Sequence, residues 1–308
     1  MHTFRLGQQY KSLECNKVIS PPTQYIQQQA IQSSSTTTTS PRAHRVNRSK
    51  RPYKCGMVFF YHVPSTGGAT IEQWLKEYTT EKNGTYSHFQ HWDRKKDGSS
   101  KNKSEKVFIK GNRKHGGMNE FVTNIKHDEW RIAHCHHSSM HLNTSEHYLS
   151  KWRTIVEGQG CAFIANIMFR DPLSHALSLF KHIKRYNSSR DVWTKHLYTK
   201  SEMGQWQTQL DYFLYNLIDR NPYGVDKYTK VQRALQILHD HFDIVTVGDH
   251  DGYKKDLLSM TGWEEREMKR VNTHREKLMF SKEEIEEMQM LMNDNGDTEF
   301  IYEVKKLY

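Results

Sequence analysis

Residues 59–72, FFYHVPSTGGATIE, join an apolar strand to a turn of small residues and then to the start of a helix. The first N–H groups of a helix have no acceptor within it, and they lie at the positive end of the helix dipole. A strand–turn–helix junction of this kind therefore binds phosphate groups. Gly67 and Gly68 let the backbone close around an anion, and Thr66 and Thr70 can add hydroxyl donors.

The junction is not a Walker A loop, because GxxxxGK[ST] is absent. A plain strand–turn–helix connection, without any ligand, would give the same pattern, since glycine-rich turns are common. The loop alone therefore leaves both interpretations open.

A second segment, residues 161–186, strengthens the phosphate interpretation. Its almost continuous apolar run, 161–169, is typical of a strand buried on both faces. The run ends at Arg170, and Pro172 suits the opening of a helix. With Arg170 at a strand end and Ser178 two turns into the helix, both side chains can reach one phosphate. The alternatives are a structural salt bridge for Arg170 and, for Ser178, a hydroxyl that bonds back to the preceding helical turn.

Together these segments resemble the carbohydrate sulfotransferases of the secretory pathway, such as heparan sulfate 2-O- and galactose 3-O-sulfotransferases. Those enzymes use 3′-phosphoadenosine-5′-phosphosulfate (PAPS) as donor and bind its 5′-phosphosulfate with a Pro-Lys-Thr-Gly-Gly-Thr loop. In this chain the loop corresponds to Pro64–Ala69. The family's Arg-Asp-Pro motif corresponds to 170–172, and the serine that follows it corresponds to Ser178. The resemblance covers roughly 55–308.

The resemblance implies a function for each matching residue. The 5′-phosphosulfate is assigned to Ser65, Thr66, Gly67, Gly68, Ala69 and Thr70. The 3′-phosphate is assigned to Arg170 and Ser178, with Arg275 in the cofactor-covering loop; a solvated loop is the alternative for Arg275. The implied architecture is the P-loop-containing nucleoside triphosphate hydrolase-like sulfotransferase fold.

One position departs from the family pattern. Ser65 stands where the family has a lysine that contacts the 5′-phosphate and the bridging oxygen. Fixed positive charge at that point is usually the largest catalytic contribution. Either another cation replaces the lysine, with His62, Lys54 and Lys110 as candidates, or the protein is a slow enzyme or binds PAPS without turnover.

The histidine-rich segment 134–141 follows the apolar start of a strand. Sulfuryl transfer to a hydroxyl needs a base, and histidine titrates near neutral pH. The related 2-O-sulfotransferases carry His-x-His in this region, so we assign His136 as the base, assisted by His134. Glu72 is a further candidate base, or an acidic residue that merely favours the helix N-terminus. A zinc site on the alternate histidines and a His-rich loop end are the other interpretations. We expect no metal.

Strands alternating with helices predict an α/β fold with a mostly parallel sheet flanked by helices. Ligands should then bind at the carboxyl ends of the strands. We expect strands at 57–63, 106–110, 130–135, 161–169 and 243–247. We expect helices at 69–79, 173–186, 205–219, 227–240, 252–260, 281–292 and 297–306. Residues 80–105 should form a polar loop.

The first 52 residues differ in composition from the rest. They carry Gln, Ser and Thr runs and end in a basic stretch, so we expect a disordered, low-complexity segment before a single domain at 53–308. No apolar run suits a transmembrane helix or a signal peptide.

Five N-glycosylation sequons and the family resemblance favour the Golgi lumen or secretory pathway, with the cytoplasm as the alternative. The four cysteines lack the spacing of a disulfide-rich framework or a metal finger, and Cys161 is expected to be a plain core residue.

The net charge of +10 suits polyanionic ligands such as PAPS and an acidic glycan acceptor. The basic residues form no stripe and no nucleic-acid-binding motif occurs, so we expect no nucleic acid partner. The sequence thus predicts a PAPS-dependent sulfotransferase acting on a carbohydrate hydroxyl. The alternatives are a catalytically weakened PAPS- or glycan-binding protein and, less favoured, a nucleotide kinase.

Overall fold

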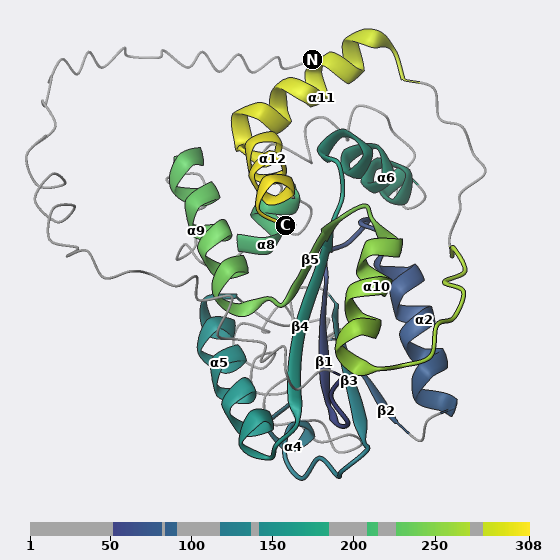
Figure 1. The fold of residues 1–308 in the computed structure, drawn as a ribbon. Coiled ribbons are helices and arrows are strands. Elements are labelled where there is room, and N and C mark those ends of the chain that lie inside the picture. Colours follow the sequence, from purple (N-terminus) through teal and green to yellow (C-terminus); the bar gives the residue numbers. More distant parts are fainter. Residues whose placement is uncertain are drawn as a thin grey trace, which may run out of the picture. The chain divides into compact units, whose positions relative to one another are not determined.

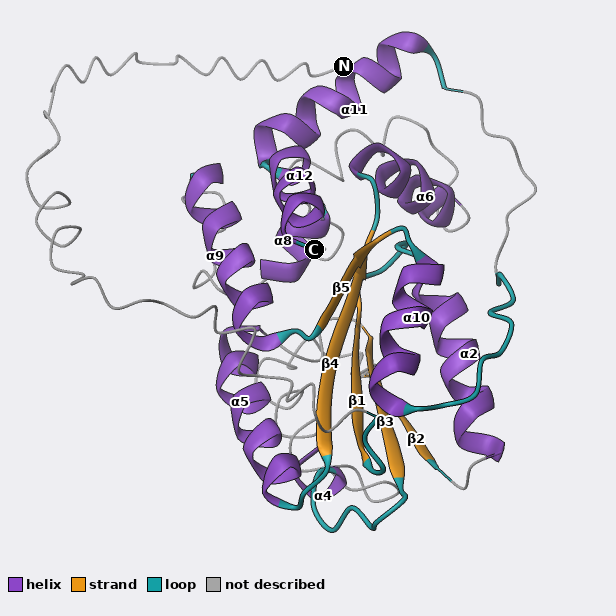
Figure 2. Cartoon of the chain, in the orientation of Figure 1, coloured by secondary structure: helices purple, strands orange, loops and turns teal. Residues whose placement is uncertain are grey.

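The computed structural model describes residues 52–81, 84–90, 118–136, 142–184, 208–214, 226–271 and 280–308. Five parallel strands form one sheet in the order β2-β3-β1-β4-β5, with helices on both faces (Figures 1 and 2). The strands are β1 (Gly56–His62), β2 (Thr85–Gln90), β3 (Trp130–His136), β4 (Ala162–Phe169) and β5 (Ile244–Val247). The predicted α/β class and mostly parallel sheet are confirmed.

The helices alternate with the strands along the chain. They are α2 (Gly68–Glu81), α4 (Met118–Phe121), α5 (Leu142–Gly158), α6 (Pro172–Lys184), α8 (Gln209–Leu214), α9 (Lys227–His241), α10 (His250–Thr261), α11 (Lys282–Asn295) and α12 (Asp297–Leu307).

Strand β1 lies at the centre of the sheet and is buried along its whole length. Because side chains alternate between the two faces of a strand, it contributes to two cores. Met57, Phe59 and Tyr61 pack in the core that contains residues of α5, α8, α9 and α12. Val58 and Phe60 pack in the core with α2 and α10. This second face, seen on the right of Figure 1, is the one that carries His62.

Most of the predicted elements agree with the structure to within a few residues, but strand β2 and helices α4 and α5 were not predicted. The expected loop over 80–105 contains the edge strand β2. Helix α5, which was not predicted, covers the sheet through Leu149, Trp152 and Val156. Of the expected helix 205–219, the described part is α8. The expected strand at 106–110 and residues 1–51 lie outside the described residues.

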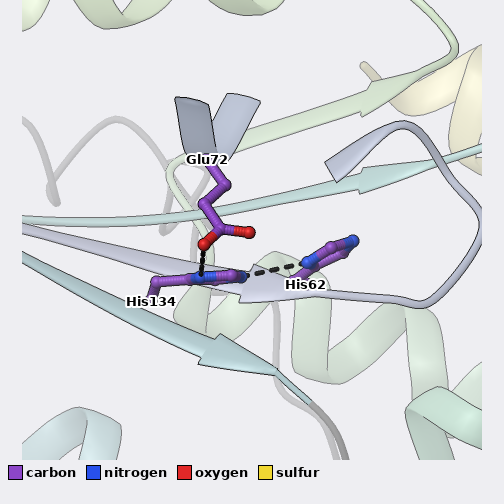
Figure 3. A group of neighbouring side chains, drawn as sticks. All are labelled: His62, Glu72 and His134. Atoms are coloured by element: carbon purple, nitrogen blue, oxygen red, sulfur yellow. Dashed lines mark hydrogen bonds and ion pairs between the residues drawn. The ribbon is translucent and has the colours of Figure 1, made fainter. Parts of the chain in front are cut away.

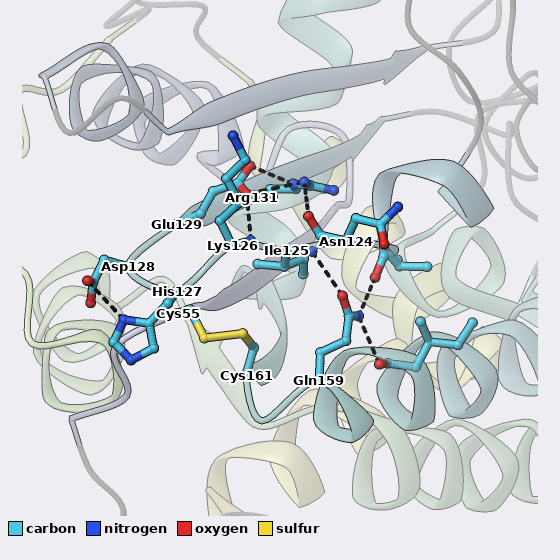
Figure 4. The surroundings of a disulfide bond; sticks show 12 residues. Cys55, Asn124, Ile125, Lys126, His127, Asp128, Glu129, Arg131, Gln159 and Cys161 are labelled. Atoms are coloured by element: carbon cyan, nitrogen blue, oxygen red, sulfur yellow. Dashed lines mark hydrogen bonds and ion pairs between the residues drawn. A yellow bond between two sulfur atoms is a disulfide. The ribbon is translucent and has the colours of Figure 1, made fainter.

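The expectation that Cys161 is a plain core residue is wrong. Cys161 forms a disulfide with Cys55, and their Cα atoms are 4.9 Å apart. The cause is the register of two adjacent strands, because each cysteine directly precedes one member of the pair Gly56 and Ala162. The bond ties the amino ends of β1 and β4 together (Figure 4).

Further polar contacts brace this amino-terminal edge. Gln159 accepts from the Ile125 N–H and donates to the Val122 carbonyl, at 2.9 Å in both cases, and Arg131 forms an ion pair with Glu129 at 2.7 Å (Figure 4). The amino-terminal edge is thus cross-linked, while the phosphate-binding motifs predicted from the sequence lie at the opposite, carboxyl edge.

Within the described residues, none of the helices combines the length and apolarity that a membrane crossing requires.

Candidate functional site

The loop between β1 and α2 forms the centre of the candidate site. Ser65 and Gly67 both adopt left-handed backbone conformations, with φ of 62° and 97°. Inside the loop the Thr66 hydroxyl donates to the Val63 carbonyl at 2.7 Å, and the Thr70 N–H donates to the Gly67 carbonyl at 3.0 Å. Thr66, Gly68 and Thr70 are buried, whereas Ser65, Gly67 and Ala69 are partly exposed. The accessible side of the loop is therefore formed by alternate residues.

The two glycines of the loop allow two histidine rings to approach. A Cβ atom at Gly68 would lie 2.1 Å from Cδ2 of His62, and one at Gly67 would lie 2.8 Å from Nε2 of His250. Any side chain at either position would overlap a ring, so these glycines are required by packing as well as by the turn. His250 begins α10, directly after β5, and its Nε2 lies 3.4 Å from the Gly67 carbonyl oxygen.

Two residues that follow β4 hold the same loop from the other side. The Arg170 Nη1 donates to the Ser65 carbonyl at 3.3 Å. His175, in the first turns of α6, lies with Nε2 2.9 Å from the Pro64 carbonyl oxygen. Burial lowers the pKa of His175 to about 4, and the nearby Arg170 acts in the same direction. His175 is therefore neutral near pH 7 and donates its Nε2 hydrogen to the loop.

The backbone of Arg170 is fixed independently of its side chain. Its N–H donates to Gln209 Oε1 at 2.7 Å, and its carbonyl accepts from Gln209 Nε2 at 2.8 Å. Asp171 caps the start of α6 by accepting from the Ser174 N–H at 3.0 Å. The Arg170 guanidinium is thus presented at the carboxyl edge of the sheet, beside the loop.

Next to the loop, two buried histidines from β1 and β3 and a partly exposed glutamate from α2 form a cluster (Figure 3). His62 Nδ1 and His134 Nε2 are hydrogen-bonded at 3.0 Å. On the far side of the His134 ring, Nδ1 lies 2.8 Å from the Tyr86 hydroxyl and 3.7 Å from Glu72 Oε1. His134 is fully buried and His62 is 6% exposed, so neither imidazole is free to exchange its partners for bulk water.

The charges of this cluster follow from its contacts. Burial opposes ionisation of Glu72, but hydrogen bonds and charge from His134 and Lys76 outweigh it and hold the pKa of Glu72 well below its usual range. Lys76 Nζ lies 2.6 Å from Glu72 Oε1. Burial, with the Glu72 charge adding to it, raises the pKa of Tyr86 well above its ordinary value. Glu72 is therefore a carboxylate and Tyr86 a neutral hydroxyl at physiological pH.

His62, Glu72 and His134 also have the composition of a metal site, since one ligand atom from each lies within 4.8 Å of the others. The two nitrogens of His134, however, point to different partners, Nε2 to His62 and Nδ1 to Tyr86 and Glu72. A single metal ion can bind only one nitrogen of a given imidazole. The observed contacts therefore form a chain of hydrogen bonds through His134. The zinc interpretation of the alternate histidines also involves His136, whose side chain lies outside the described part of the chain.

The predicted site residues are distributed unevenly around the loop. Arg170 contacts the loop, and Glu72 contacts His134, as described above. Ser178 is half-buried in α6. The Thr70 hydroxyl accepts from the Val271 N–H at 3.1 Å, which joins α2 to the segment that precedes Arg275. His136 ends β3 opposite His62 in the register, but its side chain, like the whole of Arg275, lies outside the described part of the chain.

Sequence reasoning missed two residues that contact the loop, His175 and His250, and one that holds the Arg170 backbone, Gln209. It named His62 only as one possible cation. His175 carries a weak signal, because it lies one helical turn after the Arg-Asp-Pro motif. Gln209 and His250 carry none, because only the fold brings Gln209 beside Arg170 and His250 beside Gly67.

No family model matches this chain, and no curated protein matches it.

Proposed function

We propose that this protein is a PAPS-dependent sulfotransferase that acts on a hydroxyl of a carbohydrate acceptor. The observation that carries the proposal is the contact between Arg170 and the Ser65 carbonyl, at 3.3 Å. The two segments singled out as phosphate-binding motifs lie far apart in the sequence, yet they meet at the carboxyl edge of two adjacent parallel strands. That edge is where open α/β sheets bind their ligands. The same proposal includes the P-loop-like sulfotransferase fold.

In the proposed reaction, the loop 65–70 holds the 5′-phosphosulfate of PAPS, and Arg170 and Ser178 hold its 3′-phosphate. The acceptor hydroxyl oxygen attacks sulfur while His136 takes the hydroxyl proton. The bond between sulfur and the bridging oxygen breaks, and its electron pair remains on the 5′-phosphate of the departing 3′-phosphoadenosine-5′-phosphate (PAP). No metal is needed, because the donor's charge is met by N–H groups and cations.

His134 takes a different part from His136 in this proposal. Its ring is fully buried between His62 and Tyr86. A buried imidazole cannot contact an acceptor sugar, so we assign it to positioning rather than to proton transfer with the acceptor. Glu72, whose side chain is 20% exposed, supports His134 from the helix.

Two features support a secretory location for this activity. The Cys55–Cys161 disulfide is of the kind that forms and persists in oxidising compartments. The sequons noted in the sequence point the same way. The acceptor would then be a glycan of the secretory pathway, and the net charge of +10 favours an anionic one.

Ser65 favours a second candidate, a protein that binds PAPS or glycans with little turnover. It occupies the lysine position of the family motif and carries no charge. The enzyme and a PAPS-binding protein both predict binding of PAP, and only the enzyme predicts sulfuryl transfer.

Isothermal titration calorimetry with PAP, and separately with ATP and Mg²⁺, tests the proposed ligand. The enzyme and the PAPS-binding protein both require PAP to bind far more tightly than ATP, because only PAP carries a 3′-phosphate for Arg170 and Ser178. Binding of ATP without binding of PAP would replace the proposal with a kinase-like function.

A further inference from the structure

The phosphosulfate loop lacks a cation of its own at Ser65, and the structure describes two of the three residues considered as substitutes, Lys54 and His62. Lys54 precedes β1, whereas the loop follows the other end of that strand. Lys110 lies outside the described residues. His62 is the last residue of β1 and touches the loop directly.

The contact between His62 and the loop is close. Its Cδ2, Nε2 and Cγ atoms lie 2.1, 2.2 and 2.6 Å from the position that a Cβ of Gly68 would take. The ring therefore lies against the first residue of α2, where the helix N–H groups and the positive end of its dipole are. It is stacked on Phe60 with ring centroids 5.5 Å apart, which fixes its plane.

The hydrogen bonds of His62 suit a protonated ring. In that state its Nδ1–H donates to His134 Nε2, and the His134 Nδ1–H donates to the Tyr86 hydroxyl. The Glu72 carboxylate, which lies 3.7 Å from the same His134 nitrogen, is near enough to the Tyr86 hydroxyl to raise its pKa. The His62 and His134 Nδ1–H groups thus both have acceptors, and protonation of His62 adds one further N–H, at Nε2 on the side of Gly68.

The Glu72 carboxylate provides the opposite charge for that proton. It lies 3.7 Å from His134 Nδ1 and 2.6 Å from Lys76 Nζ, so its charge is shared between the lysine and the histidine chain. A nearby carboxylate favours the charged form of an imidazole, and a bound polyanion at the loop would favour it further.

We infer that His62 is the cation of the phosphosulfate loop, protonated when the donor is bound and held in place by Glu72 through His134 and Tyr86. The inference rests on the proposed function, and it names the group that compensates for Ser65. The other titratable or charged groups around His62 and the loop are His134 on β3, Glu72 and Lys76 on α2, Tyr86 on β2, Arg170 at the end of β4, His175 on α6 and His250 on α10.

The first test is the pH dependence of PAP affinity, because the 5′-phosphate of PAP carries the charge of the leaving group. Calorimetry would be done from about pH 6 to about pH 8, which spans the ordinary histidine pKa. Because the wild type should take up one proton when PAP binds, its affinity for PAP should increase by up to about tenfold for each unit by which the pH is lowered. The phosphates of PAP titrate as well, so the informative quantity is the difference between wild type and variant.

In the variant His62→Gln, PAP affinity should no longer show this extra dependence on pH. At low pH the variant should bind PAP about 10- to 150-fold more weakly than the wild type, as expected for the loss of a charged hydrogen bond. Arg170→Ala is the matched control, because it removes a cation that does not titrate in this range. It should weaken binding and leave the pH dependence unchanged. Glu72→Gln, which keeps His62, should move the pH dependence to lower pH.

A rescue experiment separates charge from packing. Ser65→Lys should raise turnover strongly in the His62→Gln background and little in the wild type, because the lysine restores a cation only where one is missing. Thermal unfolding without ligand checks that each variant is folded.

Full retention of the pH dependence in His62→Gln, or an equal gain from Ser65→Lys in both backgrounds, would overturn the inference while PAP binding still supported the proposed function. Absence of PAP binding by the wild type at every pH would overturn both.

Discussion

Replacing Arg170 with alanine is the most direct test of the anion site, because the structure isolates its side chain from its backbone. Gln209 holds the Arg170 N–H and carbonyl through its own side-chain amide, at 2.7 and 2.8 Å. The guanidinium is directed to the Ser65 carbonyl at the edge of the loop. The substitution therefore removes a cation from the proposed site and leaves the connection between β4 and α6 in place.

The expected loss follows from the kind of contact. A hydrogen bond between an arginine and a charged group contributes about 1.5–3 kcal/mol. Since about 1.4 kcal/mol corresponds to a factor of ten, the dissociation constant for PAP should rise about 10- to 150-fold.

Calorimetry with two ligands locates the contact. PAP and adenosine 5′-monophosphate differ only in the 3′-phosphate, so the loss should be large for PAP and small for the monophosphate. Lys305→Ala, which removes an exposed cation from α12, is the control for net charge and should leave both affinities unchanged. A folded Arg170→Ala protein that binds PAP as tightly as the wild type would remove Arg170 from the site.

Three further predictions concern the base, the disulfide and a buried acid. His136→Ala should lower turnover about 10²–10⁴-fold and leave PAP affinity intact. Its pH–rate profile should also lose the limb that rises near the histidine pKa of about 6.5. Full activity of this variant would mean that the base is another residue. Cys55→Ser with Cys161→Ser should lower the free energy of unfolding, measured in urea, by about 2–5 kcal/mol, and a reductant should destabilise the wild type but not this variant. Burial raises the pKa of Asp297 to about 6, so the wild-type free energy of unfolding should decrease as pH rises from about 4 to about 6. Asp297→Asn should lose that decrease, and an identical pH profile would show that another group causes it.

The elements with strong apolar patterns could be predicted from the sequence, and those without could not. Strand β4 is apolar except at Asn166 and buried along its whole length, and it was placed to within a residue. Strand β2, TYSHFQ, is an edge strand with polar residues, and its place in the sheet depends on pairing with β3 rather than on its own composition. Helix α5 is different, because Leu149, Trp152 and Val156 recur at helical spacing and this signal could have been recognised in the sequence.

The disulfide could not be predicted because it depends on strand order. Cys55 and Cys161 are 106 residues apart, and only the pairing of β1 with β4 brings them together. The same limit applies to His62 and His134, which come from β1 and β3 and whose contact requires that these strands be neighbours.

The parts of the candidate site that lie within a single segment of the sequence could be predicted. The loop 64–70 and Arg170 were found from local patterns, strand followed by turn or by helix, and the contact between them is consistent with ligand binding at the carboxyl ends of parallel strands. The histidines that surround the loop come from four different elements, and nothing in their own segments distinguishes them from the other histidines of the chain.

The measurement that tests the central claim most directly is transfer of labelled sulfate from PAPS to a panel of glycan and simple alcohol acceptors. The proposed function predicts a labelled product and an equal amount of PAP, both lost in His136→Ala. Tight PAP binding with no transfer to any acceptor would support the binding protein instead. Neither PAP binding nor transfer in the folded wild-type protein would contradict the account.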